Sequence, residues 1–469
     1  MKLHYSTLLI VLGLLLAACS ANPGESAAGA AATTTSSPSS IPATTAEATS
    51  TNTTAPLTTS TTTTISRDGA EPVAVRTGAQ VLADSGFGQL TGARVGLIAH
   101  QNSLVEVDGL TQHLGDALFE AADVELVALF GPEHGVRGTA DAGELVADTV
   151  DERTDVPIFS LFGSTRKPTP EMLQNVDVLV YDLQDVGTRY YTYISTMGLA
   201  MQAAGEQGIP FVVLDRPNPL GGSIAGGVLE PSRVSFVGQY PIPDQYGLTA
   251  GELALEIIEQ QWLSGLDDLD LNVVSLDGWT RDMRWADTGL DWIAPSPALN
   301  TPESALLYPA TIWFEATAMS YGRGTTEPFR VLGAPWLNTT SAIEALTARE
   351  LPGIRFHATN IAPELLPGIT VTPAFVDQTI PALRLEVTDP AALRPTELGV
   401  HLLDVMSTQA ETAGVEFLAR PAWLDQLSGN TLLRTAVESG QFDVDATIDA
   451  RRQQSELATP TIEDGLLYE

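Results

Sequence analysis

The sequence predicts an α/β protein, with a doubly wound parallel sheet domain followed by a smaller α+β C-terminal domain. From residue 93 onward, short apolar runs alternate with segments of helical length, as in parallel strands joined by crossover helices. Most of these runs end in polar or ionisable residues, which is typical of sheets that bind a ligand beyond the carboxyl ends of their strands. About 400 residues follow the N-terminal region, more than one typical domain holds.

The elements of the first domain follow in regular order. Apolar runs predict strands at 94–100, 124–130, 157–161, 177–183, 210–215 and 271–276. Helical spacing predicts helices at 109–122, 191–207 and 249–262, with a shorter piece near Thr169.

The character of the sequence changes after residue 290. Three prolines between 294 and 302 make an irregular stretch, which marks a domain boundary or a loop facing a substrate. Beyond it we expect helices at 341–350 and 396–409, with short strands at 354–357 and 382–387. We therefore assign residues 67–293 to the sheet domain and 294–469 to a C-terminal domain that closes the cleft.

The first 19 residues have the pattern of a lipoprotein signal peptide. An apolar run at 8–16 is followed by two alanines and then by Cys19, the only cysteine in the sequence. The run is too short to span a bilayer permanently, and a buried core helix would not explain where the cysteine lies. We expect lipidation of Cys19 and an extracytoplasmic protein anchored to a bacterial membrane by lipid alone.

Residues 20–66 are almost entirely Ser, Thr, Ala, Pro and Asn, a composition that cannot bury enough apolar surface to fold. We interpret them as a disordered tether. Because lipidation uses Cys19, no thiol remains for a disulfide, a metal site or a nucleophile.

The formal net charge of −35 argues against binding to nucleic acid or to anionic lipid headgroups, although it also serves solubility. The sequence contains no G-x-S-x-G, no H-E-x-x-H, no phosphate-binding loop and no G-x-G-x-x-G after the first strand. We expect no cofactor and no metal site. Carboxylates with neighbouring arginines and aromatic residues remain as carriers of chemistry.

Glu133 is the first such carboxylate, because it follows a predicted strand within the turn Pro132-Glu133-His134-Gly135. It could act as a general acid in the crevice, or it could cap a helix or pair with Arg137. His134 fits an orienting hydrogen-bond partner better than a metal ligand, since no two histidines have ligand spacing.

Two other strands also end in charged residues. Asp182, Gln184 and Asp185 are followed by Arg189 and Tyr190 at a predicted helix start, where an anion could bind unless Arg189 pairs with Asp182 or Asp185.

The next strand ends in Asp215-Arg216-Pro217-Asn218, which could equally be a turn that satisfies its own charges. Farther along, Gly322 and Gly324 flank Arg323 in a loop that would allow close backbone approach, eight residues beyond Glu315.

Four runs together resemble the exo-acting β-N-acetylmuramidases, a family once described only as a domain of unknown function. The runs, in the family's order, are Phe130-Gly131-Pro132-Glu133-His134-Gly135, residues 181–193, residues 214–222 and Ser320-Tyr321-Gly322-Arg323-Gly324-Thr325-Thr326. The resemblance covers roughly residues 75 to 469. It implies a Rossmann-like domain, a smaller C-terminal domain, and an active site in the cleft between them.

The resemblance also implies an exo-acting glycosidase that releases N-acetylmuramic acid from the non-reducing ends of peptidoglycan fragments. Glu133 would protonate the leaving oxygen, and Asp182, Asp185 or Glu315 would stabilise the transition state or activate water. The lactyl carboxylate of the sugar requires a cation, for which Arg189, Arg216 and Arg323 are candidates. The predicted catalytic residues are Glu133, His134, Asp182, Asp185 and Glu315, and the predicted substrate-binding residues are Asn102, Arg137, Gln184, Arg189, Tyr190, Asp215, Arg216, Asn218 and Arg323.

Two positions depart from the family pattern. Tyr246 stands where a histidine is usual, and Ala99-His100 replaces the usual Thr-Asn after the first strand. Either change could alter specificity if the position contacts sugar.

A non-catalytic lipoprotein that binds muramyl sugars or other cell-wall ligands is the main alternative. An esterase or amidase is disfavoured, because the usual nucleophile and metal motifs are missing.

Overall fold

The computed structural model describes residues 74–138, 148–366, 372–463 and 466–469. The predicted signal peptide, Cys19 and the tether lie outside these residues. Within them, no helix is long and apolar enough to cross a membrane.

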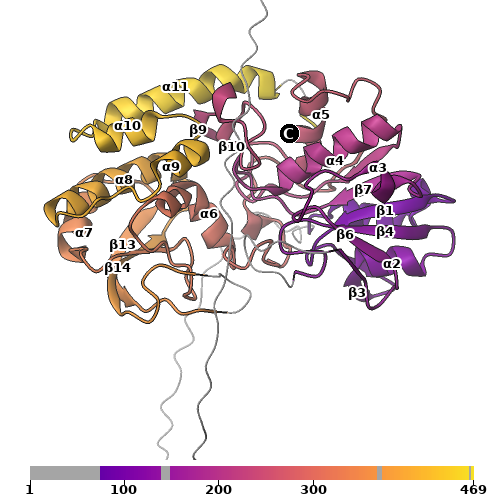
Figure 1. Cartoon of the computed structure of the whole chain (residues 1–469), viewed down its shortest axis with the longest axis horizontal. Helices are drawn as coiled ribbons and strands as arrows, with labels where there is room; N and C mark the ends of the chain where they lie inside the picture. Colours follow the sequence, from indigo (N-terminus) through magenta and orange to yellow (C-terminus); the bar gives the residue numbers. More distant parts are fainter. Residues whose placement is uncertain (1–73, 139–147, 367–371, 464–465) are drawn as a thin grey trace, which may run out of the picture. The chain divides into compact units, whose positions relative to one another are not determined.

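A seven-stranded sheet forms the first part of the described chain (Figure 1). Its order is β11 (Leu271–Val274), β8 (Phe211–Leu214), β7 (Val178–Asp182), β1 (Arg94–Ala99), β4 (Glu125–Gly131), β6 (Pro157–Ser160) and β5 (Thr149–Val150). Only the edge strand β5 is antiparallel. Numbering the six parallel strands along the chain gives the order 3-2-1-4-5-6 of doubly wound dinucleotide-binding sheets. The predicted fold class is confirmed, and all six predicted strands are present.

Alternating side chains of the central strand explain why helices cover both faces. Leu97 packs into a cluster with α1 (Gly78–Asp84) and α2 (Leu114–Glu120), whereas Ile98 belongs to the core on the other face. That face is covered by α3 (Pro170–Leu173), α4 (Tyr193–Gln207) and α5 (Ala250–Glu259). Strands buried on both faces are apolar throughout, which is why the sequence reveals them as continuous runs.

The predicted helix at 109–122 is wrong in its first half. Leu104–Val107 and Leu110–His113 form the hairpin β2–β3, and α2 begins only at Leu114. The two turn residues, Asp108 and Gly109, both have positive φ, at 53° and 76°. Asp-Gly favours this two-residue turn, so local turn chemistry overrides the helical spacing.

The C-terminal part contains a three-stranded antiparallel sheet in the order β12 (Val331–Gly333), β14 (Ile380–Val387) and β13 (Ile354–Ile361). The helices are α6 (Pro302–Thr311), α7 (Thr339–Thr347), α8 (Pro395–Thr412), α9 (Pro421–Ser428), α10 (Leu432–Glu438) and α11 (Val444–Glu463). This is the smaller α+β domain that the sequence predicts.

The last helix returns to the first part of the chain. In Figure 1, α11 lies along the hairpin of β9 (Ile224–Val228) and β10 (Pro243–Tyr246). Buried Arg451 on α11 forms an ion pair with Asp244 on β10. Beyond the helix, the Tyr468 hydroxyl donates to Asp215 over 2.6 Å. The two parts are therefore locked together by contacts made at the end of the chain.

Candidate active site

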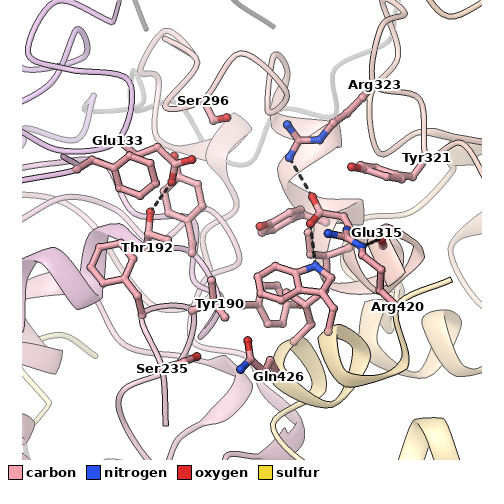
Figure 2. Close-up of a pocket in the computed structure, with 18 of the residues that line it drawn as sticks. Glu133, Tyr190, Thr192, Ser235, Ser296, Glu315, Tyr321, Arg323, Arg420 and Gln426 are labelled. Atoms are coloured by element: carbon pink, nitrogen blue, oxygen red, sulfur yellow. Dashed lines mark hydrogen bonds and ion pairs between the residues drawn. The ribbon is translucent and has the colours of Figure 1, made fainter. Parts of the chain in front are cut away.

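A cavity of about 710 Å³ lies at the carboxyl edge of the sheet. Its walls come from both parts of the chain: Glu133 and Thr192 from the first, and Glu315, Arg323 and Trp423 from the second. Figure 2 shows Glu133 and Thr192 across the cavity from Glu315 and Arg323. Volumes of roughly 300–1,000 Å³ are typical of sites that bind small ligands.

Glu133 reaches this cavity because the chain turns sharply after β4. His134 and Gly135 both have φ of 75°, and the Gly135 amide donates to the Pro132 carbonyl over 2.9 Å. The positive φ at His134 is uncommon for a residue with a side chain. The Thr192 hydroxyl donates to Oε2 of Glu133 over 2.9 Å and holds the carboxyl group in place.

His134 lines the cavity but is almost fully buried. Its ring is 6.2 Å from that of His100. Burial and the nearby His134 lower the pKa of His100 to about 3, so His100 is neutral. Tyr193 packs on His100, and its hydroxyl contacts the main-chain carbonyl of Glu133 at 3.2 Å. These rings pack beside the turn that carries Glu133, and the orienting role of His134 stays a prediction.

The opposite wall carries a carboxylate bound to cationic and aromatic groups. Glu315 lies in the short 3-10 helix 312–316, and its carboxylate accepts from Arg323 over 3.0 Å and from the Trp423 indole over 3.2 Å. Arg420 donates to the Glu315 carbonyl. Burial acts to lower the pKa of Arg323, but Tyr321 and Glu315 together raise it above its ordinary value. The Arg323 guanidinium therefore keeps its positive charge within the ion pair with Glu315.

The loop that carries Arg323 has the close backbone approach that its glycines predict. Gly324 has φ of 80°, and its carbonyl accepts from the Glu364 amide over 2.8 Å. A Cβ there would lie 2.6 Å from the Glu364 carbonyl oxygen, so no side chain fits. The group that approaches this loop closely is therefore the backbone at Glu364 of the same chain.

Aromatic residues form the floor. Tyr308 packs edge-on against both Tyr190 and Tyr191, at ring distances of 5.4 and 6.4 Å. Burial and Glu315 raise the pKa of Tyr321 to about 12, so its hydroxyl is neutral. Tyr190 lines the cavity as predicted, but it is 2% exposed and offers a ligand only a small edge.

The other two charged strand ends do not enter the cavity. Asp182 is fully buried and receives two hydrogen bonds from Arg216, at 2.6 and 3.0 Å. Asp185 is also buried, and one of its oxygens accepts from the Gly187 amide and the Tyr246 hydroxyl. Asp182 and Asp185 do not line the cavity, and Glu315 is the one of the three predicted candidates for the second carboxylate that does.

Asp215 is buried with four donors: the Thr249 and Tyr468 hydroxyls and the Gly251 and Arg216 amides. Burial raises the pKa of Asp185 and of Asp215 to about 6 in each case. Asp215 therefore joins segments of the fold to one another and does not line the cavity. Its carboxylate pairs with the main-chain amide of Arg216, while the Arg216 side chain pairs with Asp182.

The remaining predicted binding residues also lie outside this cavity. Arg189 is completely buried and pairs with Asp244 over 2.7 Å. Its partner is therefore neither of the two carboxylates considered from the sequence, Asp182 and Asp185. Arg137 pairs with Asp116 and Asp151.

Asn102, Gln184 and Arg216 line a separate cavity of about 360 Å³, and Asn218 stabilises a turn by accepting from the Leu220 amide. The predicted site residues that share the large cavity are Glu133, His134, Tyr190, Glu315 and Arg323.

Two family models match almost the whole described chain. The model for the N-terminal part of the exo-β-N-acetylmuramidase NamZ covers residues 95–303, and the model for its C-terminal part covers residues 306–468. The chain belongs to the NamZ family of exo-β-N-acetylmuramidases. The predicted family and the predicted glycosidase class are thereby confirmed.

Individual members of the NamZ family agree with this. The peptidoglycan β-N-acetylmuramidase NamZ of Bacillus subtilis strain 168 is 44% identical over 375 residues, which are 79% of this chain and 86% of that protein. Two solved DUF1343 family proteins of Bacteroides fragilis share the fold, with TM-scores of 0.76 and 0.67 at 36% and 30% identity. Each comparison covers 84% of this chain and 99% of the solved one.

The two departures from the NamZ family pattern lie away from the cavity. Tyr246 is fully buried and binds Asp185, and His100 is buried behind His134. Within the described ranges, no group of three or more His, Cys, Asp or Glu residues could hold a metal ion.

The cavity residues that the sequence did not predict include Thr192, Tyr308, Tyr321, Arg420 and Trp423. Thr192 and Tyr321 belong to the runs that carry the family resemblance, so those runs held a signal for them. Arg420 and Trp423 lie about 100 residues beyond Glu315 along the chain, and only the tertiary fold joins them to it.

Proposed function

We propose that this protein is an exo-acting glycoside hydrolase that releases N-acetylmuramic acid from the non-reducing end of peptidoglycan fragments during cell-wall turnover or recycling. The observation that carries the proposal is the Glu133 carboxyl group in the cavity, held by Thr192 and opposed by the positive charge of Arg323. A glycosidase needs the first feature, and recognition of an acidic sugar needs the second.

In this proposal Glu133 donates a proton to the leaving glycosidic oxygen. Among the described residues of the cavity, Glu315 is the other carboxylate. Glu315 is already bound by Arg323 and Trp423, so it orients the cationic wall and adds negative charge near the oxocarbenium-like transition state.

The lactyl carboxylate distinguishes N-acetylmuramic acid from N-acetylglucosamine. We assign its recognition to Arg323, with Arg420 beside it. The two guanidinium groups approach Glu315 from different sides, one at the carboxylate and one at the main-chain carbonyl. A fixed cation is needed here, since a chain of net charge −35 otherwise repels an anionic ligand.

The location is part of the proposal. A signal peptide ending in lipidated Cys19, followed by the tether 20–66, would hold the hydrolase outside the cytoplasm within reach of wall fragments.

A pair of chromogenic substrates tests the activity. The proposal predicts hydrolysis of an aryl β-N-acetylmuramide and at least roughly a hundred-fold lower kcat/KM on the matching β-N-acetylglucosaminide, which lacks the carboxylate. Arg323→Ala should remove most of this discrimination. Arg330→Ala is the matched control, because Arg330 pairs with Glu303 and does not line the cavity. Equal rates of the wild type on both substrates would refute the assignment, and binding without release would favour a non-catalytic lipoprotein.

Membrane fractionation tests the anchor. The full-length chain should sediment with membranes after expression in a bacterium, and Cys19→Ala should not acquire the lipid. Identical lipid labelling of both proteins would contradict the proposed anchor.

A further inference from the structure

A second group of side chains lines the same cavity and has no part in the chemistry described above. Phe162, Arg166 and Phe236, hereafter the Phe-Arg cluster, contribute to its wall. The Arg166 guanidinium lies over the Phe236 ring at 4.1 Å and over the Phe162 ring at 5.5 Å, and the two rings are 6.0 Å apart.

Strand pairing places Phe162 beside the catalytic turn. β6 and β4 pair through Ser160 and Gly131, and the Leu161 amide donates to the Gly131 carbonyl over 2.8 Å. Glu133 and Phe162 each follow two residues after this pairing. The strand order β7-β1-β4-β6 puts Phe162 on the side of β4 away from β7, the strand that leads to Thr192.

A tight turn presents Phe236. The Ser235 amide donates to the Gly238 carbonyl over 2.8 Å, and the Gly238 amide donates back over 3.1 Å. In Figure 2, Ser235 lies with Thr192, away from Arg323 and Tyr321. The Phe-Arg cluster therefore belongs to the part of the cavity that is farther from the cationic wall.

Arg166 is the basic member of the Phe-Arg cluster. It is exposed and, among the described residues, pairs with no carboxylate, whereas the neighbouring Lys167 binds Glu206 over 2.7 Å. An exposed guanidinium held on two aromatic rings is positioned to meet an anion that arrives from solvent.

We propose that the Phe-Arg cluster is the binding subsite for the saccharide on the reducing side of the cleaved bond, and that Arg166 receives a carboxylate carried by that saccharide. The inference rests on the proposed function. If the muramyl carboxylate binds Arg323 and Glu133 protonates the leaving oxygen, the leaving saccharide extends from Glu133 away from Arg323. Aromatic rings suit the apolar face of a pyranose, and the guanidinium suits a lactyl or stem-peptide carboxylate.

Three substrates separate this subsite from the rest of the cavity. β-N-acetylmuramyl fluoride has no leaving saccharide, the disaccharide MurNAc-GlcNAc has a neutral one, and the trisaccharide MurNAc-GlcNAc-MurNAc has one with a lactyl carboxylate. A trisaccharide whose terminal lactyl group bears a stem peptide distinguishes the two sources of the carboxylate.

Two variants and one control complete the design. Phe236→Ala should lower kcat/KM roughly ten-fold on the disaccharide and trisaccharide and leave the fluoride nearly unchanged. Arg166→Gln should lower it roughly five-fold on the trisaccharide alone, with an effect that fades as salt is added. Lys167→Gln removes the same charge one residue away and should change none of the three rates.

Equal effects of Phe236→Ala on all three substrates, or of Arg166→Gln on the disaccharide and trisaccharide, would overturn the subsite. No effect of either variant would overturn it as well. If the wild type cleaves none of the substrates, the proposed function fails separately, and the subsite is then judged by trisaccharide affinity. Unchanged dissociation constants in both variants would refute it.

Discussion

The strand ends of the large sheet fall into two groups that look alike in sequence. Glu133, two residues after β4, faces the cavity, whereas Asp182 at the end of β7 and Asp215 after β8 are fully buried and accept hydrogen bonds from neighbouring segments. All three are carboxylates at the same edge of one sheet. Neighbouring segments bury two of them, whereas the third faces a ligand-sized space, so the surroundings decide which carboxylate is available for catalysis.

Glu133→Gln should separate the two groups most strongly. It removes the proposed acid while keeping an acceptor for Thr192, so kcat on a muramyl disaccharide should fall roughly a thousand-fold with the thermal midpoint nearly unchanged. Steady-state kinetics and calorimetry on the same preparations measure both quantities. Activity within a few-fold of the wild type would show that the cavity carboxylate is as dispensable as the buried ones.

Arg216→Met should do the opposite. It leaves Asp182 buried without its cation, which costs about 3–5 kcal/mol in the free energy of unfolding, while kcat of the folded fraction should change little. Arg94→Met is the control, because Arg94 makes the same two-pronged pair with Asp177 in an exposed position, where loss of the pair should destabilise the protein much less. Urea denaturation measures the difference, and equal costs would contradict the burial argument.

Asp185→Asn should change how stability depends on pH. The pKa of Asp185 is about 6 in the folded protein, against an ordinary value of 3.8, because the carboxyl group is buried. Between these values the folded state keeps a proton that the unfolded state has lost, so this group lowers the free energy of unfolding as pH rises. The contribution is about 3 kcal/mol, lost from about pH 4 to pH 6.

The asparagine variant keeps one oxygen for the Gly187 and Tyr246 donors and should lack this loss. Denaturation curves from about pH 4 to pH 7 should therefore show the variant gaining stability relative to the wild type. Parallel pH profiles of the variant and the wild type would mean that burial does not raise the pKa of Asp185.

Thr192→Val should give the smallest effect. Loss of the hydroxyl removes one hydrogen bond to the Glu133 carboxylate, so kcat should fall roughly ten-fold with little change in KM. Thr196→Val, one helical turn onward in α4, is the control, since the Thr196 hydroxyl bonds to the Thr192 carbonyl and does not line the cavity. Identical kinetics of the two variants would remove Thr192 from the site.

The sheet could be predicted because each buried strand is an apolar run. Successive runs are separated by connecting segments long enough to cross over from one parallel strand to the next. The prediction of a helix from residue 109 is wrong because the Asp108-Gly109 turn, and not the helical spacing, decides the local structure of the β2–β3 hairpin. The return of the chain end could not be foreseen, since Tyr468 reaches Asp215 across 253 residues.

The site was predictable where one residue and its turn suffice, as at Glu133. It was not predictable where burial depends on distant partners. Arg189 was expected to bind an anion, and it does so, but the anion is Asp244 on the β9–β10 hairpin, 55 residues onward.

The most direct test of the central claim uses leaving groups of different basicity. A dinitrophenyl β-N-acetylmuramide needs no proton on departure, whereas the saccharide substrate does. Our account predicts that Glu133→Gln keeps substantial activity on the dinitrophenyl compound and loses roughly a thousand-fold on the disaccharide. Equal losses on both compounds would contradict the assignment of Glu133 as the general acid.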